Sequence, residues 1–127
     1  MENKQHAVIP LLRIFDIAKA REFYVDWLGF TIDWEHRFEE NFPVYMQVSK
    51  DNIRLHLTEH HGDCCPGSKV YIEFAGGLTA YHSLLKEKDY RYMKPGLQKA
   101  PWNALTMEVI DPFGNKLLFA EDLKSNP

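Results

Sequence analysis

The chain has 127 residues, of which 45% are hydrophobic and 26% charged, as expected for one globular domain with its own core. Its net charge of −3, from 15 basic and 18 acidic residues, argues against a nucleic-acid partner and mildly favours a cationic ligand. No apolar run approaches the roughly 20 residues that cross a bilayer, and residues 1–6 lack the apolar segment of a signal peptide, so we expect a cytoplasmic protein with no membrane partner.

The first predicted elements are a strand and a helix. Residues 8–14 are typical of a short buried strand. Asp16 offers an N-cap, apolar residues then recur at helical spacing from Ile17 to Leu28, and Gly29 stands where the residue after a helix belongs. We therefore predict an amphipathic α-helix over residues 17–28.

Three strands follow the helix. Phe30, Ile32 and Trp34 alternate with polar residues, which predicts a half-buried strand. Trp34 lies either in the core or in the wall of a pocket, and we favour the core. Residues 44–48 and 53–57 also alternate and flank a Lys-Asp-Asn turn, as in a β-hairpin with one apolar and one mixed face.

The same order of elements returns after the polar segment 59–67. The predicted elements are a strand at 70–74, a helix from Leu78 to Leu85, a short strand near 90–93, a strand at 105–109 and a closing strand at 116–120. Asp111-Pro112-Phe113-Gly114 suits a type I turn between the last two strands.

The two halves align residue by residue. An offset of about 61 residues pairs Ile9 with Val70, and a slightly longer one pairs His56 with Leu118. We predict an α+β fold in one domain, residues 1–127, of two pseudo-repeated βαβββ modules at about 7–62 and 67–122, with curved mixed sheets forming a cleft and helices on the convex side.

The register of the second module decides which side chains face that cleft. If Val70 faces the cleft, Tyr71 and Glu73 face away from it, and a shift of one residue reverses this assignment.

These landmarks resemble the vicinal oxygen chelate superfamily, which includes glyoxalase I, extradiol dioxygenases and the bleomycin resistance proteins. The resemblance covers nearly the whole chain and is carried by Ile9-Pro10, Phe15-Asp16-Ile17, Glu22-Phe23-Tyr24, Leu28-Gly29-Phe30 and Asp111-Pro112-Phe113-Gly114-Asn115. The chain is most similar to the bleomycin resistance proteins, through Gly77-Leu78, Ala100-Pro101-Trp102 and the last of these motifs. That resemblance implies a homodimer, two ligand pockets lined by both subunits, and tight sequestration of a drug without catalysis.

The resemblance also identifies where a metal ion would bind. Catalytic branches of the superfamily hold a divalent metal at four positions, which correspond here to Ile9, His56, Val70 and Leu118. Only His56 carries a donor atom, whereas zinc and related ions need three or four protein ligands. A one-residue shift from Val70 to Lys69 would not restore the site, so we predict no metal and no cofactor.

The segment 59–65 concentrates histidine, carboxylate and thiol groups, but its spacing matches no zinc pattern. It is either a polar connector between the modules or a segment that brings His60 or His61 to the ligand. Cys64 and Cys65 are adjacent, and their Cα separation of about 3.8 Å falls below the usual disulfide range. We therefore expect reduced thiols.

Trp102 is the aromatic residue most in question, since it either packs beneath its loop or, as the resemblance implies, stacks on a planar ligand. Phe38 is followed by acidic residues that either attract a cation or form a solvated surface. The predicted ligand-binding residues are His56, Trp102, Phe38, His60, His61, Leu118 and Ile9.

The sequence therefore favours a metal-independent binding protein that captures a bleomycin-like, planar and cationic antibiotic. Two alternatives stay open. One is a small lyase or isomerase that uses His56 with a loop histidine for acid–base chemistry, and the other is a module that binds a metabolite.

Overall fold

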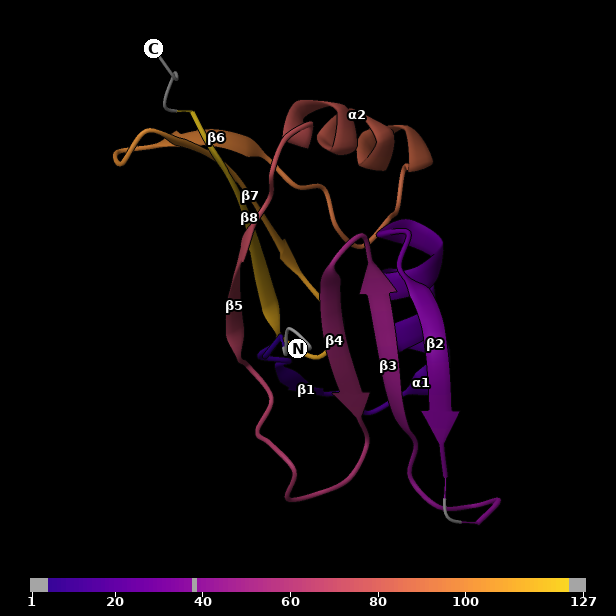
Figure 1. Ribbon diagram of the computed structural model, residues 1–127. Helices are drawn as coiled ribbons and strands as arrows, with labels where there is room; N and C mark the ends of the chain where they lie inside the picture. Colours follow the sequence, from indigo (N-terminus) through magenta and orange to yellow (C-terminus); the bar gives the residue numbers. More distant parts are fainter. Residues whose placement is uncertain (1–4, 38, 124–127) are drawn as a thin grey trace.

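The computed structural model describes residues 5–37 and 39–123, and it contains two modules with the same order of elements (Figure 1). The first comprises β1 (Leu11–Arg13), α1 (Ile17–Ala20), the π-helix η1 (Arg21–Trp27), β2 (Thr31–His36), β3 (Tyr45–Lys50) and β4 (Ile53–Thr58). The second comprises β5 (Lys69–Glu73), α2 (Leu78–Lys88), β6 (Leu97–Ala100), β7 (Ala104–Ile110) and β8 (Lys116–Asp122).

Each module forms a mixed sheet of four strands. The strand orders are β1-β4-β3-β2 and β5-β8-β7-β6. The pairs β1–β4 and β5–β8 are parallel, and the other pairs are antiparallel. This repeated topology confirms the predicted α+β fold of two βαβββ modules. None of the helices in the described part of the chain has the length and apolar character to cross a membrane.

The helix of the first module starts as predicted but changes its winding. The Asp16 carboxylate accepts a hydrogen bond from the backbone N–H of Lys19, which caps α1. From Arg21 onward the helix is wound as a π-helix, with the Leu28 N–H bonded to the Phe23 carbonyl. Gly29 then takes a φ of +86°, the left-handed conformation that favours glycine after a helix.

Two strands differ from the prediction. β1 begins only at Leu11, since residues 5–10 form no strand, although the Pro10 carbonyl accepts a hydrogen bond from the His56 N–H. Val8 is 95% exposed. The prediction of a strand near 90–93 is wrong, because this segment forms turns and loop, and the strand lies at Leu97–Ala100 instead. Tyr90 and Met93 pack against the core from that loop, which explains their apolar spacing.

Trp34 is not a core residue. The pairing of β2 with β3 shifts between Ile32 and Trp34, because Ile32 lies opposite Val48 and Trp34 lies opposite the neighbouring Gln47. This bulge turns Trp34 to the face opposite that of Ile32. The side chain is 42% exposed, so the prediction that it lies in the core is wrong.

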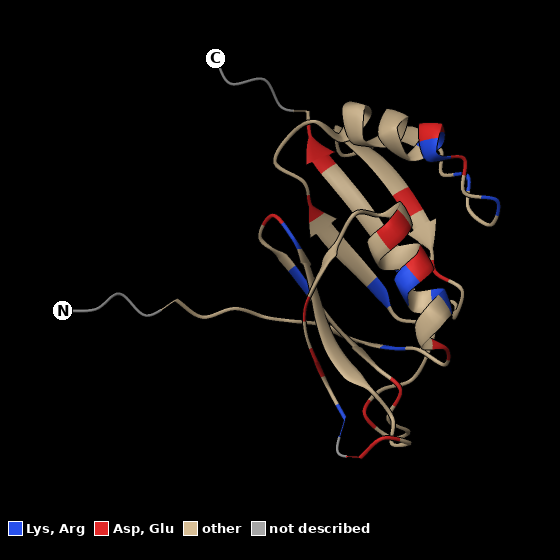
Figure 2. Cartoon of the chain, turned by 90° about the vertical axis from the view of Figure 1, so that its right-hand side faces the viewer, with Lys and Arg blue, Asp and Glu red and all other residues tan. Residues whose placement is uncertain are grey.

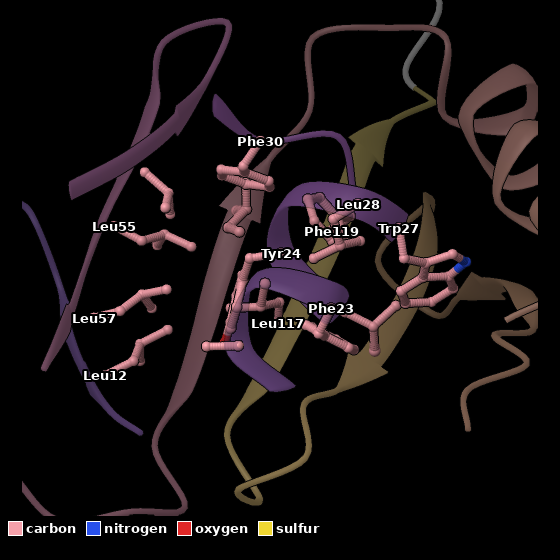
Figure 3. Packing of buried hydrophobic residues seen from close by; sticks show 14 of the residues in the cluster. Leu12, Phe23, Tyr24, Trp27, Leu28, Phe30, Leu55, Leu57, Leu117 and Phe119 are labelled. Carbon is pink, nitrogen blue, oxygen red and sulfur yellow. The ribbon is translucent and has the colours of Figure 1, made fainter. Parts of the chain in front are cut away.

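The core is shared by both modules. Figure 3 shows the first helix between leucines of the first sheet and side chains of the second, and these residues belong to one buried cluster. Members from the three layers include Leu12, Leu55, Leu57, Phe23, Tyr24, Leu117 and Phe119. The inner faces of both sheets are therefore covered, which leaves their other faces available to a ligand.

A buried polar network joins the β7–β8 turn to the first module. The Asp111 carboxylate accepts hydrogen bonds from the Tyr24 hydroxyl at 2.6 Å, from the backbone N–H groups of Phe113 and Asn115, and from the Asn115 side-chain amide. That amide also donates to the Arg13 carbonyl. The turn predicted from the sequence thus ties the helix and β1 of one module to the other.

Candidate functional site

The outer face of the second sheet carries two neighbouring cavities. Its side chains alternate with the core residues, so that Lys69, Tyr71 and Glu73 of β5 point to the same face as Leu118 of β8. One cavity, of about 460 Å³, includes Lys69, Glu108 and Leu118, and we call it the mixed-charge cavity. The other, of about 550 Å³, includes Tyr71, Glu73 and Asp122, and we call it the acidic cavity.

Trp102 lines both cavities. It sits in the tight loop between β6 and β7, after Pro101 and before Asn103, whose φ is +63°. The Asn103 N–H bonds to the Ala100 carbonyl at 3.1 Å, which closes the loop. Trp102 is 56% exposed, so its indole does not pack under the loop. Because the loop backbone is fixed, the exposed ring offers a flat surface on which a ligand can stack.

The two cavities differ in charge. In the mixed-charge cavity, the Lys69 ammonium lies 2.9 Å from a Glu108 carboxylate oxygen, and Lys99 also contributes to the lining. The acidic cavity is lined by the carboxylates of Glu73 and Asp122, and no lysine or arginine of residues 5–37 and 39–123 lines it. The half-exposed ring of Tyr71 adds a second aromatic surface there. This combination favours a flat ligand that carries positive charge.

The register of β5 corrects the assignment of Val70. Tyr71 lies opposite Leu118 in the second sheet, just as Leu11 lies opposite His56 in the first. The repeat offset for these strands is therefore 60 residues, one less than the predicted value, and Val70 packs against the core. Tyr71 and Glu73 consequently face the acidic cavity, which is the reversal that a one-residue shift produces.

The outer face of the first sheet carries an aromatic group around His56. The rings of Trp34 and Tyr45 are nearly parallel at 6.0 Å between centroids, and the imidazole packs edge-on against both. The Tyr45 hydroxyl lies 2.7 Å from His56 Nδ1, and Gln47 Oε1 lies 3.0 Å from Nε2. Both ring nitrogens therefore have partners within the chain.

The neighbours of His56 determine its protonation state. Gln47 donates its amide hydrogen to Asp33 at 2.9 Å, which leaves Oε1 as an acceptor for His56 Nε2–H, so Nδ1 accepts from Tyr45. Burial and the nearby charge of Arg54 lower the pKa of His56. The imidazole is neutral at neutral pH and carries its proton on Nε2.

The connector between the modules lies beside this aromatic group. The His60 ring packs edge-on against Tyr45, with 6.5 Å between the ring centroids. His61 is exposed, and its backbone forms an isolated β-bridge with that of Cys64. Cys64 and Cys65 are free thiols, as expected. Burial, followed by the charge of Asp63, raises the pKa of Cys64, which keeps this thiol protonated.

The metal site of the catalytic branches has no counterpart among these residues. Ile9 precedes β1, His56 and Leu118 lie on outer faces, and Lys69 replaces Val70 on the outer face of β5. One imidazole among aliphatic and ammonium groups does not fit a divalent metal. Across residues 5–37 and 39–123, no three histidine, cysteine or acidic side chains gather where they could hold a metal ion.

The structure separates the predicted ligand-binding residues into two groups. Trp102 and Leu118 line the same cavity on the second sheet, whereas His56 and His60 both contact Tyr45 on the first. Ile9 is half-buried, His61 is exposed and Phe38 lies outside the described residues. Their part in binding stays a prediction.

Sequence reasoning left Tyr71 and Glu73 dependent on the register, and it missed Asp122, Tyr45 and Gln47 as residues of these faces. A comparison of the two hairpins could have found Tyr45 and Gln47, because they alternate with core residues on the same face as His56.

A comparison with protein families decides the relationship. The model of the glyoxalase superfamily matches residues 2–126. The chain belongs to this superfamily. It is 27% identical to the bleomycin resistance protein of Geobacillus stearothermophilus over 134 aligned positions, which cover 92% of this chain and 97% of the relative. The relative from Staphylococcus aureus shows the same identity and coverage.

Three solved structures share the fold. A bleomycin-binding protein in complex with bleomycin aligns with a TM-score of 0.68 and 18% identity, covering 93% of this chain and 99% of that one. The bleomycin resistance determinant of transposon Tn5 gives a TM-score of 0.71 at 17% identity, covering 93% and 98%. An antibiotic-binding protein of Streptomyces sp. CB03234, TnmS3, gives 0.69 at 20% identity, covering 94% and 99%.

Proposed function

We propose that this glyoxalase superfamily protein sequesters a planar, cationic antibiotic of the bleomycin type without a metal ion. The observation that carries the proposal is the position of Trp102, half-exposed on a rigid loop between two cavities. A flat ring system stacks on such an indole, and stacking supplies affinity without any chemical step. The antibiotic-binding relatives support the same class of ligand.

The charge of the acidic cavity supports the cationic part of this proposal. Glu73 and Asp122 attract a positively charged group, and Tyr71 offers it a ring face. Attraction between opposite charges also raises the rate of encounter, and salt weakens this effect. Binding should therefore become weaker as the salt concentration rises.

We further propose that the protein acts as a homodimer in the cytoplasm. Each chain exposes two outer sheet faces, with Trp102 and Leu118 on one and His56 and His60 on the other. A second copy that covers the second sheet with its first sheet would enclose a ligand between both groups and would exclude water from it.

Isothermal titration with metal-free bleomycin tests the proposal. The wild-type protein should give saturable heat at micromolar concentration, and Trp102→Ala should weaken binding by about tenfold or more, equivalent to about 1.4 kcal/mol. Leu84→Ala removes a similarly exposed apolar side chain from α2 and should leave binding unchanged. The absence of heat with the wild type, or an equal loss in both variants, would refute drug capture at this face.

The alternative enzyme function rests on a different observation. Gln47, which is held by Asp33, orients the His56 ring through Nε2, as a general base requires. A substrate would have to displace the Tyr45 hydroxyl to reach Nδ1. Turnover of any substrate should then fall at least about 100-fold in His56→Ala, in line with the usual contribution of a general base. Unchanged turnover in this variant would remove the alternative.

A further inference from the structure

A third hollow lies away from the outer sheet faces. It has a volume of about 260 Å³ and shares no lining residue with the two cavities described above. Four segments of the chain meet there, namely α1, η1, the loop after α2 and the β7–β8 turn. Figure 2 views the first helix from the front and shows basic residues both on it and in the loop after α2.

The walls of this hollow are aromatic. The rings of Tyr90 and Tyr92 meet at 78° with centroids 5.7 Å apart, and Phe23 lies 6.1 Å from Tyr90. Ile110 and Pro112 add aliphatic surface. Two ring faces set almost at a right angle form a corner, which gives a flat ring both a stacking surface and an edge contact. The small volume suits one or two fused rings rather than a drug-sized molecule.

Two cations stand at Tyr92. The Lys19 ammonium lies 5.2 Å from the centre of this ring, and the Arg91 guanidinium carbon lies 5.4 Å from it. Neither forms a salt bridge within the described part of the chain. Of the two, only Lys19 lines the hollow, and Tyr92 is 61% exposed, so the Lys19 ammonium lies at the open side of the hollow. An anionic group that enters there would gain this ammonium as a charge partner.

The acidic group that lines the hollow is already engaged. Asp111 is 4% exposed, and its carboxylate accepts hydrogen bonds from the Tyr24 hydroxyl, two backbone N–H groups and the Asn115 amide. Its oxygens are therefore directed inward, away from an incoming ligand. Burial and the neighbouring Glu22 raise the pKa of Tyr90 to about 12, so this wall stays uncharged at neutral pH.

We propose that this hollow binds a small aromatic carboxylate, with the ring in the corner of Tyr90 and Tyr92 and the carboxylate at the Lys19 ammonium. The site is independent of antibiotic capture, because it lies elsewhere on the chain and takes a ligand of opposite charge. It would give the protein a second ligand, whose binding can be measured whether or not bleomycin binds.

Titration with naphthoate, followed by amide chemical shifts, tests this site, and the uncharged naphthamide serves as the matched ligand. Naphthoate should shift the signals of Lys19, Tyr92 and Ile110. Naphthamide should bind about tenfold more weakly, which is equivalent to about 1.4 kcal/mol for the lost charged contact. Lys19→Met keeps the length of the side chain and removes its charge, so it should reduce naphthoate binding to the level of naphthamide and leave naphthamide unchanged.

Lys50→Met is the matched control. Lys50 lies over the ring of Tyr81 at 4.9 Å, which is a comparable contact at a distance from the hollow, so its loss should leave naphthoate binding intact. Equal affinity for naphthoate and naphthamide would overturn the proposal. So would the absence of shifts at millimolar ligand, equal effects of both lysine variants, or shifts confined to the Trp102 loop.

Discussion

The hydrogen bond between Tyr24 and Asp111 provides a direct test of how the two modules are held together. Its donor and acceptor are both buried, they are 2.6 Å apart, and the Asp111 carboxylate depends on it for one of four hydrogen bonds. Burial, together with the charge of Asp111, raises the pKa of Tyr24, so the hydroxyl remains a donor throughout the neutral range.

Tyr24→Phe removes this hydroxyl and keeps the ring, so the core retains its packing. A hydrogen bond to a charged group contributes about 1.5–3 kcal/mol, and the loss is felt fully when the acceptor stays buried. With a urea m-value of about 1–3 kcal/mol/M, the unfolding midpoint should fall by roughly 1 M. Fluorescence of the buried Trp27 reports the transition.

Tyr81→Phe is the matched control for this experiment. The Tyr81 hydroxyl is also buried, but it donates to the neutral carbonyl of Leu28 at 2.5 Å. Hydrogen bonds between neutral groups contribute only about 0.5–1.5 kcal/mol, so this variant should lose less stability. A loss in Tyr24→Phe no larger than that in Tyr81→Phe would refute the argument that the buried carboxylate makes the inter-module contact strong.

Three further predictions follow from local geometry. Arg54→Gln should raise the pKa of His56 in an NMR titration, and an unchanged pKa would contradict the effect of Arg54. Because the folded pKa is lower than the unfolded value, the unfolding free energy falls as the pH drops below about 6.5. This fall should be smaller in the variant. Asp16→Ala should cost about 1 kcal/mol in urea unfolding, because the Lys19 N–H loses its acceptor. Gly29→Ala should destabilise the protein by about 1 kcal/mol or more, since its φ of +86° disfavours any side chain, and a neutral result would contradict the left-handed conformation.

The sequence predicted the fold well where hydrophobic periods are regular. Alternation in residues 44–58 gave the β3–β4 hairpin, and the repeat of elements gave the second module. The spacing of Phe23, Tyr24 and Trp27 predicted a buried helical face but not its π winding, because these side chains are buried in either winding. The spacing of Tyr90 and Met93 likewise predicted a strand, because both side chains pack against the core although their segment is a loop.

The site was harder to predict, since one residue of register exchanges the two faces of a strand. The bulge in β2 brought Trp34 out of the core, and an offset of 60 rather than 61 residues moved Tyr71 and Glu73 onto the outer face. The sequence correctly placed Trp102 in a loop before a strand. The alternation of the hairpin could have placed Tyr45 and Gln47 on the face of His56, but it could not give their hydrogen bonds to the imidazole, because these depend on cross-strand neighbours.

The shared core also affects the order in which the protein can form. Tyr24 donates its hydrogen bond to Asp111, which lies 87 residues later in the chain, and the Asn115 amide donates to the Arg13 carbonyl, 102 residues earlier. During synthesis the first module therefore emerges with the inner side of its helix uncovered, and it gains its final packing only after the β7–β8 turn has left the ribosome. Folding dominated by such distant contacts is slow, and this nascent half is the stage at which the chain is most exposed to aggregation.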